Sequence, residues 1–196
     1  FVGYYEHGDA TAETTSADGW LKTGDAAVID PRGHLAIIDR AKDVGRLSDG
    51  TAFAPQFVEN KLKFSPYIRE AVAFGHEHPF VTAMIAIDMN TVGNWAERRG
   101  LAYTSFMDIA RKPDVAALIV GEAAKVNATL PEALRVRRIL LLEKELEADD
   151  NEMTRTRKVR RGYVAEKYAS VLQAFYGSKA SAEVTVEITF EDGRKT

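Results

Sequence analysis

The pattern of apolar and turn-forming residues changes at Arg40, and this change limits the folds that the chain can adopt. Before it, residues 35–38 form a short apolar run, and residues 30–33 (Asp-Pro-Arg-Gly) match a turn with Pro second and Gly fourth. A segment of this length cannot bury a hydrophobic core by itself. We therefore expect residues 1–40 to be a β-rich piece at the end of a larger domain. The first residue is Phe1 rather than Met, so we also expect the chain to be a piece of a longer protein.

Residues 41–196 follow a different pattern, in which helix-like and strand-like segments are interspersed. The strand-like segments are short apolar runs, whereas the longest helical segment begins with Pro113, which the first turn of a helix tolerates. The pattern predicts an α+β domain with a small three-stranded sheet flanked by helices. We expect strands at 71–74, 82–87 and 138–142, helices at 55–64, 91–99, 104–111, 113–129 and 159–175, and a hairpin around 191–193.

Composition excludes several classes of function. Hydrophobic residues make up 45% of the chain and charged residues 28%, which is typical of a soluble globular protein. The absence of cysteine excludes disulfides, thiol catalysis and cysteine-based metal sites, and it fits a cytoplasmic location. No apolar run reaches the length of a membrane span, and the first residues do not form a signal-peptide pattern. The net charge of −3 gives no general attraction to nucleic acid, so we expect no nucleic-acid partner.

Asp25 is the first candidate for a binding residue, because it ends the tripeptide Thr-Gly-Asp. A carboxylate has two acceptor oxygens, which can take both hydroxyl groups of a ribose. Gly24 allows the backbone to approach a ligand closely. The tripeptide alone is better explained by an Asp that caps a turn. Trp20 lies five residues before Asp25, and an Asp-Arg-x-Lys sequence follows the next strand; together they belong to a motif set whose family resemblance, given next, implies the ribose-binding role.

Three groups of motif residues occur in a fixed order along the chain: Gly19-Trp20 with Thr23-Gly24-Asp25, then Asp39-Arg40-Ala41-Lys42-Asp43, and far downstream Thr154-Arg155-Thr156-Arg157-Lys158. Their order and spacing resemble the C-terminal part of an AMP-forming acyl-CoA synthetase, and residues 90–160 are similar to the long-chain fatty acid type. The resemblance implies that residues 1–40 end the large adenylate-binding domain. It implies that residues 41–196 form the small, mobile C-terminal domain.

The resemblance also implies a role for the residues around the domain boundary. Asp25 and Arg40 would contact the ribose of ATP. Lys42 would be the hinge between the domains, and Gly45 just after it could loosen that hinge. Gly50 would lie in the loop that lines the tunnel for the pantetheine arm of CoA once the small domain has rotated.

Lys158 is the catalytic residue that the resemblance implies. In the family, the Lys that ends Thr-x-Thr-x-Lys enters the active site during adenylation. Its ammonium group can bridge the substrate carboxylate and the α-phosphate while charge moves between them. Two Arg residues are inserted in the motif here, so Arg157 is the nearest competitor for this role. Residues 155–161 contain five basic side chains, which also suits a nucleic-acid patch or the basic start of a helix.

The implied reaction has two halves. A carboxylic acid and ATP give an acyl-adenylate and pyrophosphate, and the CoA thiol then displaces AMP. The implied cofactors are ATP, CoA and Mg²⁺, and the Mg²⁺ ligand is expected upstream of Phe1 with the phosphate loop and the acyl pocket. The implied partners are the small-molecule substrates and the missing N-terminal domain, and peripheral association with a membrane stays open. The competing interpretation is a stand-alone, non-enzymatic interaction module that uses the basic residues 155–161.

His76-Glu77-His78 has a spacing that could bind a metal ion. No third or fourth ligand is evident nearby, and Pro79 indicates a loop. We therefore expect a surface turn here and no metal site in the chain.

Overall fold

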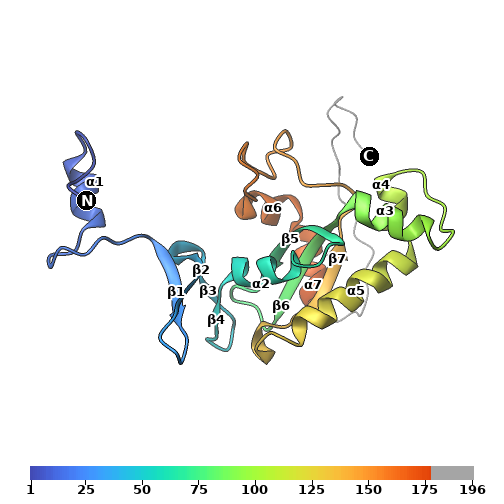
Figure 1. Ribbon diagram of the computed structural model, residues 1–196, viewed down its shortest axis with the longest axis horizontal. Coiled ribbons are helices and arrows are strands. Elements are labelled where there is room, and N and C mark those ends of the chain that lie inside the picture. The colour runs from blue at the N-terminus through green and yellow to red at the C-terminus, as the bar shows by residue number, and fades with distance from the viewer. Residues whose placement is uncertain (178–196) are drawn as a thin grey trace.

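A three-stranded sheet forms the centre of the computed structural model, which describes residues 1–177 (Figure 1). β5 (Ile68–Phe74) and β6 (Val81–Ile87) pair as an antiparallel hairpin, and β7 (Val136–Leu141) pairs with β6 in parallel. β6 is therefore the central strand, and every one of its residues is buried. The predicted α+β class with a small three-stranded sheet is confirmed.

Helices cover both faces of this sheet. Successive side chains of a strand point to opposite faces, so Ile85 belongs to one hydrophobic cluster and Met84 to the other. The helices of the first cluster are α2 (Pro55–Leu62), α3 (Met89–Glu97), α4 (Phe106–Ala110) and α5 (Pro113–Asn127). Those of the second are α6 (Arg161–Lys167) and α7 (Ala169–Tyr176). Two covered faces explain why β6 is a nearly continuous apolar run rather than an alternating one.

The N-terminal segment contains one helix and one β-hairpin. β1 (Asp25–Ile29) pairs antiparallel with β2 (Leu35–Arg40), and the predicted turn at 30–33 closes the hairpin with a hydrogen bond of 2.9 Å from the amide of Gly33 to the carbonyl of Asp30. The expectation of β-structure is wrong for α1 (Gly8–Thr14). α1 buries none of its residues, so it lacks the apolar face by which a sequence pattern reveals a helix.

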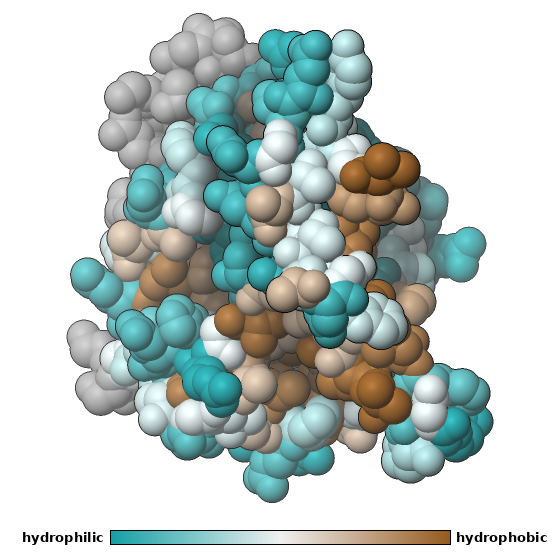
Figure 2. All heavy atoms as spheres, turned by 90° about the vertical axis from the view of Figure 1, so that its left-hand side faces the viewer, coloured by the Kyte–Doolittle hydropathy of each residue, from teal (hydrophilic) through white to brown (hydrophobic). Residues whose placement is uncertain are grey.

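Large apolar side chains are exposed on the β1–β2 hairpin. Val28, Ile29, Leu35 and Ile37 are all exposed, and Figure 2 shows apolar side chains gathered on the side of the molecule that carries the hairpin. A two-stranded hairpin is marginally stable by itself in water, and exposed apolar patches commonly mark surfaces that another part of a protein covers. The expectation that this segment belongs to a larger domain stays a prediction.

Short elements connect the hairpin to the sheet domain. They are η1 (Ala41–Asp43), β3 (Gly45–Arg46) and β4 (Ala52–Phe53), and η2 (Glu132–Leu134) precedes β7. The predicted single helix at 159–175 is corrected to α6 and α7, which are separated at the buried Tyr168. The hairpin predicted around 191–193 lies outside the described residues. No helix within residues 1–177 is long and apolar enough to cross a membrane.

Candidate functional site

Asp25 and Arg40 face each other across the β1–β2 hairpin. They are register partners, and 2.6 Å separates Oδ1 of Asp25 from Nη1 of Arg40. The same nitrogen donates to the carbonyl of Thr23 at 3.3 Å. Oδ2 of Asp25 accepts no hydrogen bond from residues 1–177, and both side chains are partly exposed. The structure thus brings the two predicted ribose-binding residues together and leaves one carboxylate oxygen available to a ligand.

Lys42 lies in a single 3₁₀ turn, η1, between two extended stretches. Arg40 before the turn has φ −77° and ψ 138°, and Val44 after it has φ −74° and ψ 115°. The side chain of Lys42 is exposed and makes no hydrogen bond or ion pair with the described residues. Hinges need only a few positions that absorb a change of dihedral angles, and a short turn between extended residues provides them.

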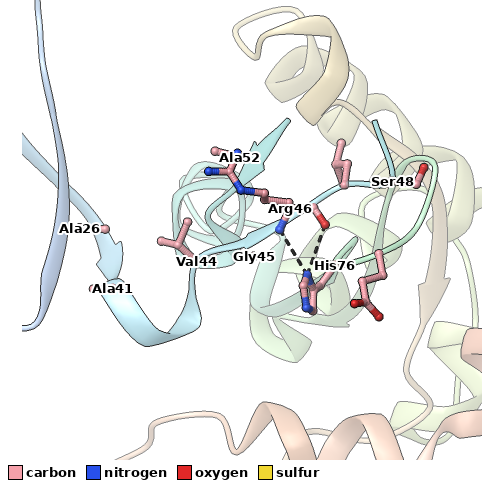
Figure 3. Close-up of a pocket in the computed structure, with 10 residues that line it drawn as sticks. Ala26, Ala41, Val44, Gly45, Arg46, Ser48, Ala52 and His76 are labelled. Carbon is pink, nitrogen blue, oxygen red and sulfur yellow. Dashed lines mark hydrogen bonds between the residues drawn. The ribbon is translucent and has the colours of Figure 1, made fainter. Parts of the chain in front are cut away.

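Gly45 packs tightly against His76 beside this turn. A Cβ at Gly45 would lie 2.7 Å from Nδ1 of His76, so only glycine fits at the present spacing. The amide of Arg46 donates to the same Nδ1 at 3.2 Å (Figure 3). This contact fixes the chain directly after the predicted hinge to the turn that follows β5. Gly45 therefore serves close packing in this conformation, beside its expected effect on hinge flexibility.

Gly50 lies in the turn between β3 and β4 and has a φ of +87°, which favours glycine. Its amide donates to the carbonyl of Leu47 at 2.9 Å, and its carbonyl accepts from Nη1 of Arg46 at 2.9 Å. An open hollow lies beside this turn, and Figure 3 shows its lining residues. Ala26 of β1 also lines the hollow, so it lies between the N-terminal hairpin and the β3–β4 segment.

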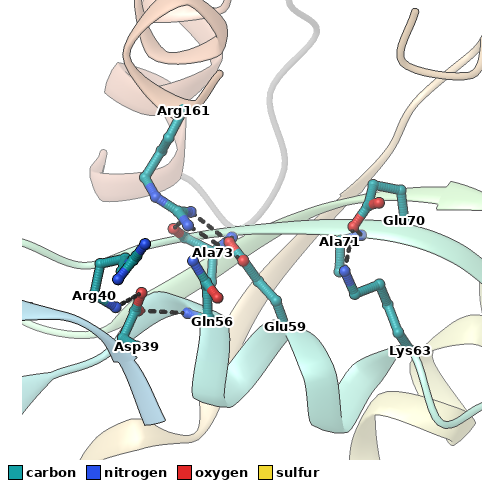
Figure 4. A network of polar contacts seen from close by, with 9 residues as sticks. All are labelled: Asp39, Arg40, Gln56, Glu59, Lys63, Glu70, Ala71, Ala73 and Arg161. Carbon is teal, nitrogen blue, oxygen red and sulfur yellow. Dashed lines mark hydrogen bonds and ion pairs between the residues drawn. The ribbon is translucent and has the colours of Figure 1, made fainter. Parts of the chain in front are cut away.

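Asp39 is a functional candidate that the sequence analysis did not single out. It is 4% exposed and accepts two backbone hydrogen bonds, from Arg40 at 2.7 Å and from Gln56 at 2.9 Å (Figure 4). Gln56 is in the first turn of α2, whose N-cap residue Ala54 has no side chain that can cap the helix. Asp39 therefore caps α2 from β2, across the predicted hinge at Lys42.

Lys158 is on a tight hairpin of residues 153–159, which we call the Lys158 hairpin. A bridge between Met153 and Val159 closes it, and the amide of Thr154 donates to the carbonyl of Lys158 at 2.8 Å. Arg157 has a φ of +58°, an uncommon backbone conformation for a residue with a side chain. The side chain of Lys158 is exposed and makes no hydrogen bond or ion pair within residues 1–177, so its ammonium group is available to a substrate.

Arg155 and Arg157 are exposed on the same hairpin, and neither side chain has a hydrogen bond or ion pair in the described part of the chain. The geometry therefore does not separate Arg157 from Lys158, and the choice between them stays a prediction. No hydrogen bond or ion pair among residues 1–177 joins Lys158 to Asp25 or Arg40.

A buried ionic cluster supports one stem of the Lys158 hairpin. Glu152 is fully buried, and its carboxylate lies 2.7 Å from Nζ of Lys167, 3.3 Å from Nζ of Lys144 and 3.1 Å from the hydroxyl of Tyr168. Burial raises the pKa of Tyr168, and the charge of Glu152 adds to this effect. Burial by itself would lower the pKa of Lys144, but its hydrogen bond to Asp150 and the charge of Glu152 outweigh burial and raise it. The cluster therefore favours the charged form of Lys144 and the neutral, hydrogen-bonded form of Tyr168.

His76-Glu77-His78 forms the predicted surface turn after β5. The amide of Glu77 donates to the carbonyl of Arg46 at 2.8 Å, and the carbonyl of His78 accepts from the amide of Ser48 at 3.0 Å. These bonds attach the turn to the β3–β4 segment. Residues 1–177 contain no group of three His, Cys, Asp or Glu side chains that could hold a metal ion.

The chain matches the family model of the AMP-binding enzyme C-terminal domain over residues 42–180. It is 36% identical over 180 residues to the long-chain-fatty-acid–CoA ligase FadD15 of Mycobacterium tuberculosis, a match that covers 91% of this chain and 30% of the relative. It is 30% identical over 181 residues to the human long-chain-fatty-acid–CoA ligase 1, covering 91% of this chain and 26% of the relative. The chain thus spans less than a third of these relatives.

Among solved structures, the chain is similar to the adenylation domain of a carboxylate reductase from Mycobacterium chelonae. The TM-score is 0.66 at 24% sequence identity, and the match covers 89% of this chain and 26% of that one. At this identity, the likeness shows the fold alone.

Replacing Asp39 by Ala removes the acceptor of two backbone amides, one of them in the first turn of α2. We expect the free energy of unfolding of the chain to fall by about 1–2 kcal/mol, which is typical for the loss of a helix cap. Urea unfolding followed by circular dichroism measures this. The control is Asp149→Ala, because Asp149 is exposed and has no hydrogen bond or ion pair with the described residues. Equal stability of the two variants would show that Asp39 is not a cap.

Proposed function

This chain belongs to the AMP-binding enzyme C-terminal domain family, and we propose that it is the C-terminal part of an ATP-dependent acyl-CoA synthetase that activates a fatty acid. The observation that carries the proposal is the 36% identity to a long-chain-fatty-acid–CoA ligase over 91% of the chain. The 9% of the chain outside this match is shorter than the 24 residues that precede Asp25 and the 38 residues that follow Lys158. The similarity therefore spans both the Asp25–Arg40 pair and the Lys158 hairpin.

Residues 1–40 would end the large N-terminal domain, and residues 41–196 would form the mobile C-terminal domain. The match to the family model begins at residue 42, directly after the β1–β2 hairpin. The exposed apolar side chains of that hairpin would be covered by the large domain, which is the main partner of this segment. Without that domain, the chain would not catalyse the reaction.

In the first half-reaction, a carboxylate oxygen of the fatty acid attacks the α-phosphorus of ATP, and pyrophosphate leaves. The Oδ2 atom of Asp25, which has no partner within residues 1–177, would accept hydrogen bonds from the ribose hydroxyls. Arg40, which is paired with Asp25, would orient its carboxylate and would itself contact the ribose. The exposed ammonium group of Lys158 would stabilise the charge that moves between the carboxylate and the α-phosphate.

In the second half-reaction, the sulfur of CoA attacks the carbonyl carbon of the acyl-adenylate, and AMP leaves with the bonding electron pair. A rotation at Lys42 would withdraw the Lys158 hairpin and bring the turn of Gly50 to the same site. The glycine at this point presents no side chain, and a Cβ there would project into open space. The pantetheine arm of CoA could therefore pass close to the backbone.

Mg²⁺ would accompany ATP, with its protein ligand in the large domain, and the described residues offer no cluster that could hold the ion themselves. We propose that the enzyme is cytoplasmic. Peripheral association with a membrane is compatible with a fatty-acid substrate. Nucleic acid is not a proposed partner, because the net charge is −3. The second candidate function, a basic interaction module, has only one observation in its favour, the exposed basic side chains of the Lys158 hairpin.

Lys158→Ala in the full-length enzyme tests the catalytic role. We expect carboxylate-dependent pyrophosphate exchange to fall about 100-fold or more, since the developing charge loses a positioned cation. The formation of acyl-CoA from supplied acyl-adenylate should change much less. Arg157→Ala is the matched variant, because Arg157 is equally exposed on the same hairpin. A larger loss in Arg157→Ala, or equal losses in both half-reactions of Lys158→Ala, would refute the assignment.

Lys42→Pro tests the hinge. Proline fixes φ near −65° and disfavours helical dihedrals in the preceding residue, Ala41, which is part of η1 here. We expect the full-length variant to keep adenylate formation and to lose acyl-CoA formation, because one of the two poses becomes inaccessible. Rates of both half-reactions are measured separately, with circular dichroism to confirm folding. Wild-type rates in both half-reactions would show that rotation does not occur at Lys42.

A further inference from the structure

The buried Glu59 and the partly exposed Arg161 form an ion pair between α2 and α6, although 102 residues separate them in the sequence. Glu59 is 5% exposed, and both of its carboxylate oxygens contact the guanidinium group, with 3.2 Å between Oε2 and Nη2. Such a two-pronged contact fixes the orientation of both side chains, which a lysine could not do. Figure 4 shows Arg161 reaching from α6 to Glu59 on α2.

The two side chains of the ion pair also provide hydrogen-bond partners for backbone groups at the outer edge of the sheet. β5 is an edge strand among the described residues, so backbone groups on its outer side have no partner strand. The amide of Ala73 donates to Oε1 of Glu59 at 2.8 Å, and the carbonyl of Ala73 accepts from Nη1 of Arg161 at 3.3 Å. Helix α2, strand β5 and helix α6 therefore meet at one point, and both backbone polar groups of Ala73 have a partner there.

Charges near the predicted hinge act on the same guanidinium group. Burial alone would lower the pKa of Arg161, but the hydrogen bond to Glu59 and the charges of Glu59, Asp39 and Asp43 outweigh it and raise the pKa. Asp39 and Asp43 flank Lys42 in the sequence, and Asp39 caps α2. Arg161 is thus linked electrostatically to the segment at which the domain would rotate.

Arg161 is also close to Lys158 along the chain. It begins α6 two residues after Val159, at which the Lys158 hairpin closes. Glu152 lies one residue before the other closing residue, Met153, and is fully buried in the ionic cluster described above. One stem of the hairpin therefore ends at a buried charge and the other at a partly buried one, whereas residues 154–158, which include Lys158, are exposed. Arg161 joins the start of α6, directly after the hairpin, to Glu59 of α2.

We infer that Arg161 is a positioning residue for Lys158: its pairing with Glu59 fixes the start of α6, directly after the Lys158 hairpin, relative to α2, so that the ammonium group arrives at the adenylation site in one orientation. This inference rests on the proposed function, because Arg161 would act only through the catalytic role proposed for Lys158. Arg161 itself would contact no substrate. It acts by limiting where the tip of the hairpin can lie, and positional errors of this kind are costly for catalysis.

The test compares two variants of the full-length enzyme, Arg161→Met and the double variant Glu59→Gln with Arg161→Met. The single variant leaves a buried carboxylate without its cation and should be less stable to urea than the wild type. The double variant removes both charges and should recover much of that stability, while the stem that leads into α6 still lacks its link to α2. We expect pyrophosphate exchange to be about 100-fold lower in both variants, with acyl-CoA formation from supplied adenylate nearly unchanged.

Hydrogen exchange gives a second readout in the same two variants. The amides of Thr154 and Arg157, which donate within the hairpin, should exchange faster than in the wild type. Arg161→Lys should recover pyrophosphate exchange in part, because it restores the charge without the two-pronged contact. The control is Arg137→Met, which removes an arginine from an exposed ion pair with Glu132 and should change neither readout.

The outcomes separate this inference from the proposed function. If the double variant regains both stability and pyrophosphate exchange, Arg161 is only a structural residue and the inference is wrong. If Lys158→Ala loses pyrophosphate exchange in the same assay while both Arg161 variants keep it, the inference fails and the proposed function stands. If Lys158→Ala itself keeps pyrophosphate exchange, the proposed role of Lys158 fails.

Discussion

A carboxylate buried as deeply as that of Glu59 must be paired and hydrogen-bonded, because an isolated charge is very costly to remove from water. Its partners are the guanidinium group of Arg161 and the amide of Ala73, which come from α6 and from the edge strand β5. Helix α2, which carries Glu59, packs on one face of the sheet, and α6 packs on the other. The requirement to satisfy this one charge therefore connects elements on both faces around the edge of the sheet.

This connection relates the proposed hinge to the proposed catalytic residue. Asp39 caps α2 at one end of the link, and Arg161 holds the Lys158 hairpin at the other. Breaking the ion pair of the buried Glu59 on every turnover would be expensive. Among residues 1–177, the turn around Lys42 is crossed by the capping hydrogen bond from Gln56 to Asp39 but by no ion pair. Motion would therefore concentrate at Lys42. The helix α2, the sheet and the Lys158 hairpin would move together as one body.

Local sequence signals were sufficient to predict the helices and strands that show a periodic apolar pattern or a characteristic residue at their start. The strands β5, β6 and β7 and the helix that begins at Pro113 were predicted from such signals. The pairing of Asp25 with Arg40 on adjacent strands was not predicted, because the resemblance implied only that both residues contact the ribose. The Glu59–Arg161 pair could not be predicted, because charged side chains are usually exposed and no local pattern reports a contact over 102 residues. The break between α6 and α7 was missed for a similar reason. Tyr168 lies at that break, and its hydroxyl donates a hydrogen bond to the buried Glu152. Sequence periodicity does not encode such a tertiary contact.

The most direct test of this account measures distances between spin labels in the full-length enzyme by pulsed electron paramagnetic resonance. Labels at Arg32→Cys on the N-terminal hairpin and Val120→Cys on α5 report rotation at Lys42, and labels at Val120→Cys and Arg155→Cys report movement of the Lys158 hairpin within its domain. On exchanging a non-hydrolysable acyl-adenylate analogue with AMP and CoA, the first distance should change and the second should not. A change in the second distance as large as in the first would contradict the account, because the hairpin would then move independently of α2.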